Sequence, residues 1–298
     1  MDAQRTLKRQ ISCAGIGLHS GQKVTLTLKP ASADTGIVFR RTDLGIDIPA
    51  TVAHVTSIQY ATVLGRDGAT VETVEHLLAA LTCAGVDNVI VELSQREVPI
   101  MDGSSAPFLY LIQEAGVKKL SAVRQYIKVL RPITVTSGDK RAAIYPSDHF
   151  KVSYTISFDH PLLRHQSRTT RITEQIFAEE IASARTFGFL KEVEWLRQQG
   201  LALGGSLENA VVIGDTGVLN ALRFEDEFVR HKILDAVGDL TLLGRAVLGH
   251  VVAHRAGHAM HTDLAARLLD ERDAWCLVNE RAGEAEVLHG VPAAARAN

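Results

Sequence analysis

The sequence predicts an α+β fold made of two halves of similar design. Segments with the period of strands alternate with segments with the period of helices, and the order helix, strand, helix occurs once in each half. The chain has 298 residues, 46% of them hydrophobic, so it can bury a large core. We place the junction near Arg124, which gives an N-terminal domain of residues 1–124 and a C-terminal domain of residues 125–298.

The first half begins with strands and continues with helices. Residues 24–30 and 36–41 have strand-like patterns bounded by turns. Apolar residues then recur at helical spacing over residues 70–85, where Gly85 supplies a stop. Residues 87–93 read as a buried strand and residues 106–116 as a second helix.

The second half opens with a new series of strands at residues 125–135. A helix at residues 224–244, a strand at residues 246–257 and a helix at residues 258–271 then repeat the earlier order. Between them, residues 188–213 combine an amphipathic helical stretch with a glycine-rich loop, which predicts an insert.

Composition and charge exclude several classes of protein. The 32 basic and 34 acidic residues give a net charge of −2, without the basic patch that a nucleic-acid partner requires. Three scattered cysteines indicate neither a disulfide framework nor a cysteine metal site and favour the cytoplasm. No apolar stretch has the length of a signal peptide or a membrane span, so we expect contact with a membrane surface only from the water side.

His231 and Asp235 form the first candidate pair of metal ligands. They stand four residues apart on a predicted helix, so they share a face and can direct two ligand atoms at one ion. Asp239 continues this face one turn further. The same spacing also occurs in surface His–Asp pairs, so this pair alone does not establish a site.

His250, His254 and His258 also recur every four residues and form a rival cluster. Residues 250–254 alternate between polar and apolar side chains and contain β-branched valines, which favours a strand. On a strand, the same spacing spreads the three imidazoles over about 13 Å. One ion could not then bind all three.

Glu75 and His76, at the start of a predicted helix, form the second candidate pair. Adjacent residues on a helix diverge by about 100°, yet both can face a cleft that borders the end of the helix. Zinc hydrolases use a histidine ligand close to a carboxylate base. The alternative is a solvated glutamate beside a structural histidine.

Together these residues can form a site for one zinc ion per chain, with the fourth position open for a water molecule whose pKa the ion lowers. Glu75 would accept a proton from that water, and His258 would protonate the amine that leaves when an amide is cleaved. Asp239 would orient His258 and favour its charged form. The three protein ligands would be His76, His231 and Asp235.

Six motifs in this chain resemble those of the UDP-3-O-acyl-N-acetylglucosamine deacetylases, a family of zinc enzymes in lipid A biosynthesis. The resemblance covers essentially the whole chain. It implies a small-molecule substrate, an acylated UDP-amino sugar from which acetate is released. We expect a monomer. In chain order the motifs are GIGLHSG, TVETVEHLLAAL, PIMDGSSAPF, ARTFGF, HKILDAVGDL and RAGHAMH.

The resemblance implies the same zinc, base and acid assignments, and it adds further roles. Thr186 matches a threonine that stabilises the oxyanion, and Phe187 matches an aromatic residue that packs on the sugar. Lys232 matches a cation associated with substrate binding in the active site. His19 would contact the nucleotide or a phosphate, although a histidine in an ordinary turn explains its motif equally well.

The resemblance also implies a fold of two similar two-layer α/β sandwich domains, packed with the active site between them and each carrying an insert. The insert at about residues 188–213 would form an apolar passage for the acyl chain. Without the resemblance, its apolar residues read more readily as a small hydrophobic cluster. After His258 the family often has two asparagines and a lysine, whereas this chain has His261, Thr262 and Asp263. His261 is therefore a second candidate for the acid.

Two other functions remain open on the sequence. One is a zinc amidohydrolase that acts on another substrate, and the other is a non-catalytic two-domain binding protein with structural histidines. GIGLHSG lacks the spacing of a phosphate-binding loop and reads as a β-turn. No GxSxG motif supports a serine hydrolase, and Asp102 and Gly103 suit a turn before a helix capped by Ser104 or Ser105.

Overall fold

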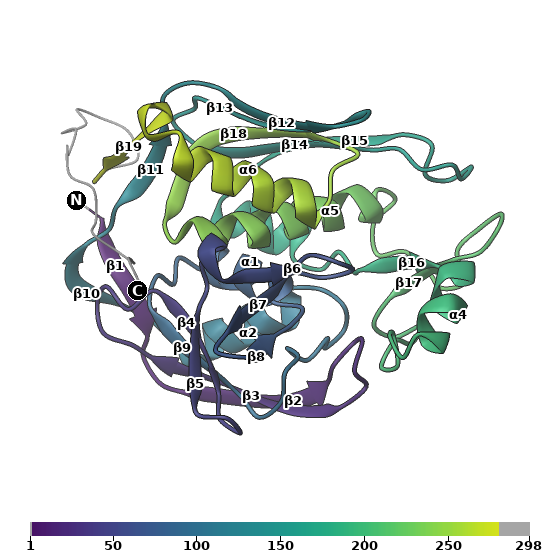
Figure 1. Cartoon of the computed structure of the whole chain (residues 1–298), viewed down its shortest axis with the longest axis horizontal. Helices are drawn as coiled ribbons and strands as arrows, with labels where there is room; N and C mark the ends of the chain where they lie inside the picture. The colour runs from purple at the N-terminus through teal and green to yellow at the C-terminus, as the bar shows by residue number, and fades with distance from the viewer. Residues whose placement is uncertain (1, 280–298) are drawn as a thin grey trace.

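Two β-sheets form the outer layers of the molecule, and helices from both halves of the chain fill the space between them (Figure 1). The computed structural model describes residues 2–279; Met1 and residues 280–298, the end of the predicted second domain, lie outside the described residues. The fold is α+β, as the sequence predicts. Apolar side chains from both sheets and the helices between them join in one large cluster.

The sheet of the first half has the strand order β2-β3-β9-β4-β5, antiparallel except for the parallel pair β4 and β9. Along β3, Leu26 and Leu28 are fully buried and alternate with more exposed residues, which fixes the face that packs on the helices. The strands of this half are β1 Ala3–Leu7, β2 Ile11–Ile16, β3 Lys23–Pro30, β4 Ile37–Arg41, β5 Ile46–Pro49, β6 Val55–Ser57, β7 Val63–Arg66, β8 Ala69–Val71, β9 Val89–Leu93 and β10 Val117–Val123.

Helices α1 (Glu75–Cys83) and α2 (Ala106–Ala115) lie on the inner side of this sheet. Thr73, with a φ of 58°, turns the chain just before α1, and Gly85, with a φ of 71°, follows its end as predicted. Almost every residue of α1 is buried. The reason is that α1 packs against α2 of its own half and against α5 of the second half.

The sheet of the second half has the order β12-β13-β18-β11-β19, and β14 pairs with both β18 and β15. The central strand β18 is parallel to β11 and β14 and antiparallel to β13. The strands are β11 Tyr126–Val129, β12 Ile133–Ser137, β13 Lys140–Tyr145, β14 Phe150–Ile156, β15 Gln166–Arg171, β18 Ala246–His254 and β19 Trp275–Val278.

Helices α5 (Glu227–Leu240) and α6 (His258–Asp270) line the inner side of the second sheet. The apolar face of α5 is buried, and the face that carries His231 and Asp235 is buried too, because α1 covers it. A glycine makes this contact possible: a Cβ atom on Gly238 would overlap the main-chain carbonyl oxygen of Glu75. The start of α1 therefore lies directly against α5.

The predicted insert stands between two short strands. Strand β16 (Phe187–Phe189) pairs in parallel with β17 (Val211–Ile213), and helix α4 (Leu190–Gln198) projects from this pair with no buried residues (Figure 1). The remaining helical segments are α3 Glu174–Ile176, the π-helical turn Phe177–Ile181 and the 3₁₀ turns Val52–His54, Thr241–Leu243 and Arg272–Ala274.

The boundary between the two domains near Arg124 stays a prediction. The pairing of the strands on either side of Arg124 supports it. β10 pairs with β1, whereas β11 pairs with β18 and β19 of the second sheet, so the chain changes partners between residues 123 and 126. Over the described residues, no helix has both the length and the apolar character needed to cross a membrane.

Candidate metal centre

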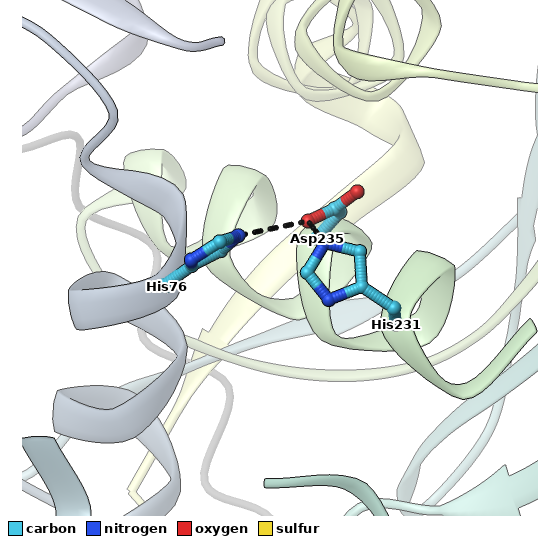
Figure 2. Close-up of side chains that lie close together, drawn as sticks. All are labelled: His76, His231 and Asp235. Atoms are coloured by element: carbon cyan, nitrogen blue, oxygen red, sulfur yellow. Dashed lines mark ion pairs between the residues drawn. The ribbon is translucent and has the colours of Figure 1, made fainter. Parts of the chain in front are cut away.

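Helices α1 and α5 bring His76, His231 and Asp235 together between the two halves (Figure 2). The Oδ1 atom of Asp235 lies 3.2 Å from Nε2 of His231 and 3.7 Å from Nε2 of His76. One ligand atom from each of the three residues lies within 4.8 Å of the others. The three side chains are at most 4% exposed. Residues separated by more than 150 positions in the chain thus meet in one buried group that could hold a metal ion. We call His76, His231 and Asp235 the metal group.

The surroundings of these side chains fit a cation. Oδ1 of Asp235 is buried without a hydrogen-bond partner, whereas Oδ2 accepts a hydrogen bond of 2.7 Å from Nζ of Lys232. A bare buried carboxylate oxygen is costly unless a cation or a donor satisfies it. His231 donates from Nδ1 to the Ala184 carbonyl at 3.0 Å, which leaves Nε2 free to bind. Two imidazoles and a carboxylate are ligands that suit Zn²⁺.

The charge states of the same residues also suit metal binding. Burial lowers the pKa of His231 to about 4, so its imidazole is neutral at pH 7. Burial opposes ionisation of Asp235, but the neighbouring His231 and the Lys232 ammonium hold the pKa of this carboxyl well below its usual value. A neutral imidazole and an ionised carboxylate are the forms that bind metals.

Glu75 lies beside the group at the first position of α1, with 3% of its surface exposed. Its Oε2 accepts a hydrogen bond of 3.2 Å from the main-chain N–H of Thr62, and its Oε1 lies 3.9 Å from Nε2 of His258. Burial raises the pKa of Glu75 above its ordinary value. A carboxylate with a raised pKa is a better proton acceptor near neutral pH.

His258, at the start of α6, turns one ring nitrogen toward a carboxylate and the other toward the metal group. Nδ1 donates to Oδ2 of Asp239 at 2.8 Å, and Nε2 lies 4.0 Å from Oδ2 of Asp235. Burial alone lowers the pKa of His258, but the charge and hydrogen bond of Asp239 raise it to about 9. Burial opposes ionisation of Asp239 as well, yet His258 lowers the pKa of this carboxyl to about 2. The two residues therefore form a buried ion pair at pH 7.

His261 is the other histidine that the sequence leaves as a candidate acid, and the structure gives it different contacts. Its Nδ1 donates to the same Oδ2 of Asp239 at 2.8 Å, but its Nε2 lies 3.0 Å from the hydroxyl of Tyr154. Burial raises the pKa of Tyr154 well above 10, so the phenol keeps its proton and shares a hydrogen bond with that nitrogen. His258, rather than His261, turns its free nitrogen toward Glu75.

Phe187 and Lys232 border the metal group, and Thr186 directly precedes Phe187 in the chain. The ring of Phe187 lies 6.2 Å from that of His231, and Nζ of Lys232 lies 5.7 Å from the centre of the Phe187 ring. The main chain of Thr186 is held by a hydrogen bond of 2.8 Å from its N–H to the carbonyl of Gly103. The segment that carries Thr186, from the second half of the chain, is thus attached to the first half at Gly103.

His19 lies in the turn between β2 and β3, as the GIGLHSG motif predicts. Its main-chain N–H donates to Glu97, and the N–H of Leu203 donates to its carbonyl at 3.2 Å. The ring is 8% exposed, packs 6.3 Å from that of Tyr60, and leaves both nitrogens without a hydrogen-bond partner. These contacts join His19 to the insert rather than to the metal group.

The rival cluster does not form a single site. His250 and His254 lie on β18, as the alternating pattern predicts, whereas His258 begins α6. Nε2 of His250 lies 2.8 Å from the hydroxyl of Ser153, and His254 is exposed. Only His258 of the three lies at the metal group.

Sequence reasoning missed Thr62 and Tyr154, which contact Asp239 and His261 of the site. It also missed that the hydroxyl of Ser105, expected as a helix cap, donates instead to the carbonyl of His76 at 2.7 Å. The hydroxyl of Ser104 accepts the N–H of the first residue of α2 at 3.2 Å. Isolated threonine, tyrosine and serine residues carry no sequence signal for such contacts.

Two imidazoles and a carboxylate beside a buried glutamate, between the facing helices of an α+β fold, are typical of metal-dependent hydrolases. Comparison with known proteins agrees. The LpxC family, described as UDP-3-O-acyl N-acetylglycosamine deacetylase, matches residues 4–270. The chain therefore belongs to the LpxC family.

Three relatives, each named UDP-3-O-acyl-N-acetylglucosamine deacetylase, match nearly the whole chain. The protein of Pseudomonas entomophila (strain L48) is 51% identical over 302 residues, which cover 99% of this chain and 100% of the relative. That of Syntrophotalea carbinolica is 50% identical over 286 residues, with 95% and 92% covered. That of Hahella chejuensis is 49% identical over 299 residues, with 98% and 99% covered.

Proposed function

We propose that this chain is a zinc-dependent deacetylase that hydrolyses the N-acetyl group of UDP-3-O-acyl-N-acetylglucosamine and releases acetate in lipid A biosynthesis. The observation that carries the proposal is the meeting of His76, His231 and Asp235 beside Glu75 and His258 in one buried group. Three relatives that are about 50% identical over nearly the whole chain carry the name of this deacetylase, which supports the proposed substrate.

One Zn²⁺ ion per chain would be held by Nε2 of His76, Nε2 of His231 and a carboxylate oxygen of Asp235. When bound, zinc acts as a Lewis acid that polarises a carbonyl group and lowers the pKa of a water molecule. The unsatisfied Oδ1 of Asp235 and the neutral imidazole of His231 support this assignment.

Glu75 is the general base. Burial raises the pKa of its carboxyl group above the ordinary value, which makes the carboxylate a better acceptor for a proton of the attacking water. The water oxygen bonds to the acetyl carbon, and the bond between that carbon and the sugar nitrogen then breaks.

His258 is the general acid. It is protonated below about pH 9, and its Nε2 faces Glu75 and the metal group while Asp239 holds Nδ1. The imidazolium gives its proton to the departing nitrogen, so that acetic acid and a neutral amine form, and the acid then loses its proton to solvent as acetate. The proton that Glu75 accepted restores His258 for the next turnover.

Three further residues contact the substrate in this proposal. The hydroxyl of Thr186 donates to the developing oxyanion, Phe187 packs on the sugar, and Lys232 supplies a positive charge next to Asp235. His19 offers a buried imidazole with two unsatisfied nitrogens to a polar group of the nucleotide. All four roles follow the family resemblance.

The insert at residues 188–213 would receive the acyl chain. Leu190, Trp195 and Leu203 are 40%, 50% and 53% exposed. The insert therefore presents several large apolar side chains to solvent within one short segment. The Trp195 ring lies 6.4 Å from that of Tyr60 in the first half. Such a surface favours a substrate that carries a long hydrocarbon group.

Acetate release from the zinc-loaded protein tests the function. We expect rapid release from the 3-O-acylated UDP-N-acetylglucosamine and much slower release from UDP-N-acetylglucosamine, which lacks the acyl chain. Equal rates on both sugars would favour a zinc amidohydrolase with another substrate. Absence of both stoichiometric zinc and activity would favour a non-catalytic binding protein.

A further inference from the structure

Thr62 lies between two carboxylates that come from opposite halves of the chain. Its side chain is fully buried. Its main-chain N–H donates to Oε2 of Glu75 at 3.2 Å, and its hydroxyl donates to Oδ1 of Asp239 at 2.6 Å. One residue therefore contacts both the proposed base and the carboxylate that orients the proposed acid.

With the hydroxyl of Thr62, both carboxylate oxygens of Asp239 accept hydrogen bonds. Oδ2 of this carboxylate already accepts hydrogen bonds from His258 and His261, both at 2.8 Å. Oδ1 has the Thr62 hydroxyl as its short partner. Because an ionised carboxylate can only accept, the threonine must be the donor. With both oxygens bonded, the carboxylate cannot rotate without losing a charge-assisted hydrogen bond.

Thr62 is well suited to hold both partners rigidly. A β-branched side chain has restricted χ1 freedom, so its hydroxyl keeps a nearly fixed direction relative to its own main chain. The carbonyl of Thr62 accepts the N–H of Val74, the residue before Glu75, at 3.5 Å. Both the start of α1 and the side chain of Glu75 are thus tied to the same residue.

We propose that Thr62 is a positioning residue for the hydrolysis, which keeps Glu75 and the His258–Asp239 pair in a fixed relation across the junction of the two halves. This inference rests on the proposed function, because it needs a base and an acid that act on one substrate. Thr62 acts through these residues. The positioning is lost when its hydroxyl is removed, even though the metal ligands are untouched.

The first test compares Thr62→Val with Thr62→Ser in the zinc-loaded protein. Valine keeps the shape and the main-chain N–H but lacks the hydroxyl, so kcat is expected to fall about 10- to 100-fold, as for the loss of a hydrogen bond to a charged group, with KM and zinc content unchanged. Serine keeps the hydroxyl and is expected to retain most of kcat. A wild-type kcat in Thr62→Val, or an equal loss in Thr62→Ser, would overturn the inference.

Thr6→Val is a matched control. Thr6 is also buried, on β1 of the first half, and its hydroxyl donates to the carbonyl of Asn88 at 2.7 Å. This variant is expected to lose stability but not kcat. A loss of kcat in Thr6→Val as large as that in Thr62→Val would reduce the Thr62 effect to general destabilisation and overturn the inference.

A double-mutant cycle with Asp239→Ala separates this inference from the proposed function. If Thr62 acts through Asp239, Thr62→Val costs nothing further in the Asp239→Ala background, in kcat or in the free energy of unfolding. Additive losses would overturn the inference. A wild-type protein that releases no acetate would instead contradict the proposed function, while the unfolding cycle would still decide whether the two side chains are coupled.

Discussion

His258 and Asp239 form a buried ion pair in which Nδ1 of the imidazole lies 2.8 Å from Oδ2 of the carboxylate. Asp239 is fully buried, so this contact takes place away from water, where the attraction between charges is strong. The contact joins α6 to α5 and leaves the second nitrogen of His258 facing Glu75.

The pH dependence of kcat should follow from this pair. His258 must be protonated to act as the acid, and its pKa is raised to about 9, so activity is expected to fall as the pH rises through about 9. Glu75 must be ionised, and burial raises its pKa above 4.5, so the acid limb should lie above pH 4.5. A pH–rate profile measures both limbs.

Asp239→Asn tests the origin of the basic limb. The neutral amide removes the charge that favours the imidazolium, and burial then lowers the pKa of His258. Activity should therefore be lost at a lower pH than in the wild type. A basic limb that stays in place in Asp239→Asn, or that persists in His258→Ala, would remove His258 from the acid role.

The zinc content of purified variants should distinguish the metal ligands from the general base Glu75. His76→Ala and Asp235→Ala each remove a ligand and are expected to purify with far less than one zinc per chain. Glu75→Gln keeps all three ligands, so it should retain zinc while kcat falls by about 10²- to 10⁴-fold. Metal analysis and acetate release on the same preparations check both. Equal zinc loss in all three variants would contradict these roles.

The close packing of α1 on α5 should not tolerate a side chain at position 238. In Gly238→Ala the new methyl group would overlap the carbonyl of Glu75, so the helices must separate at the metal group. We expect a loss of about 1–3 kcal/mol in the free energy of unfolding and weaker zinc binding. Urea unfolding and zinc titration measure the two effects.

Gly217→Ala is the control for that substitution, because a Cβ atom there would meet nothing within 4 Å. Its free energy of unfolding is expected to stay within about 0.5 kcal/mol of the wild type. Equal stability of both variants would show that the helices do not approach as closely as described.

Glu227 should make stability depend on pH. It is fully buried at the start of α5 and accepts hydrogen bonds from the side chain and N–H of Arg185. Burial alone raises the pKa of Glu227, but the hydrogen bonds from Arg185 and the N–H of Arg223 lower it below 4.5. A lowered pKa stabilises the fold at neutral pH, and this contribution is lost as the pH falls below about 4.5.

Glu227→Ala removes that contribution and leaves the guanidinium of Arg185 buried without its partner. The expected loss at pH 7 is about 3–5 kcal/mol in the free energy of unfolding. The difference from the wild type should shrink as the pH falls from 7 to 3 in urea unfolding experiments. A difference that stays constant over this range would contradict the assignment.

Much of the fold could be predicted because the periods of strands and helices are clear in the sequence. Residues 70–85 and 224–244 contain α1 and α5, and residues 24–30 form β3 almost as expected. The strand order could not be predicted, because it depends on pairings such as β9 between β3 and β4, which join distant segments. The burial of both faces of α5 depends on α1 in the same way.

The metal group could be predicted because its ligands occur in two local patterns, each on a helix. The positions of Thr62 and Tyr154 beside Asp239 and His261 could not, because one hydroxyl or phenol gives no periodic signal. His261 was ambiguous for a related reason: its ring orientation depends on Tyr154, which lies on a strand more than 100 residues earlier.

A crystal structure of the zinc-loaded protein with anomalous scattering from the metal tests the central claim most directly. The account predicts one ion, bound at about 2.0–2.2 Å by Nε2 of His76, Nε2 of His231 and a carboxylate oxygen of Asp235. An ion bound instead by Asp239, His258 and His261, a second cluster in the described part of the chain whose ligand atoms lie within 4.8 Å of one another, would contradict it.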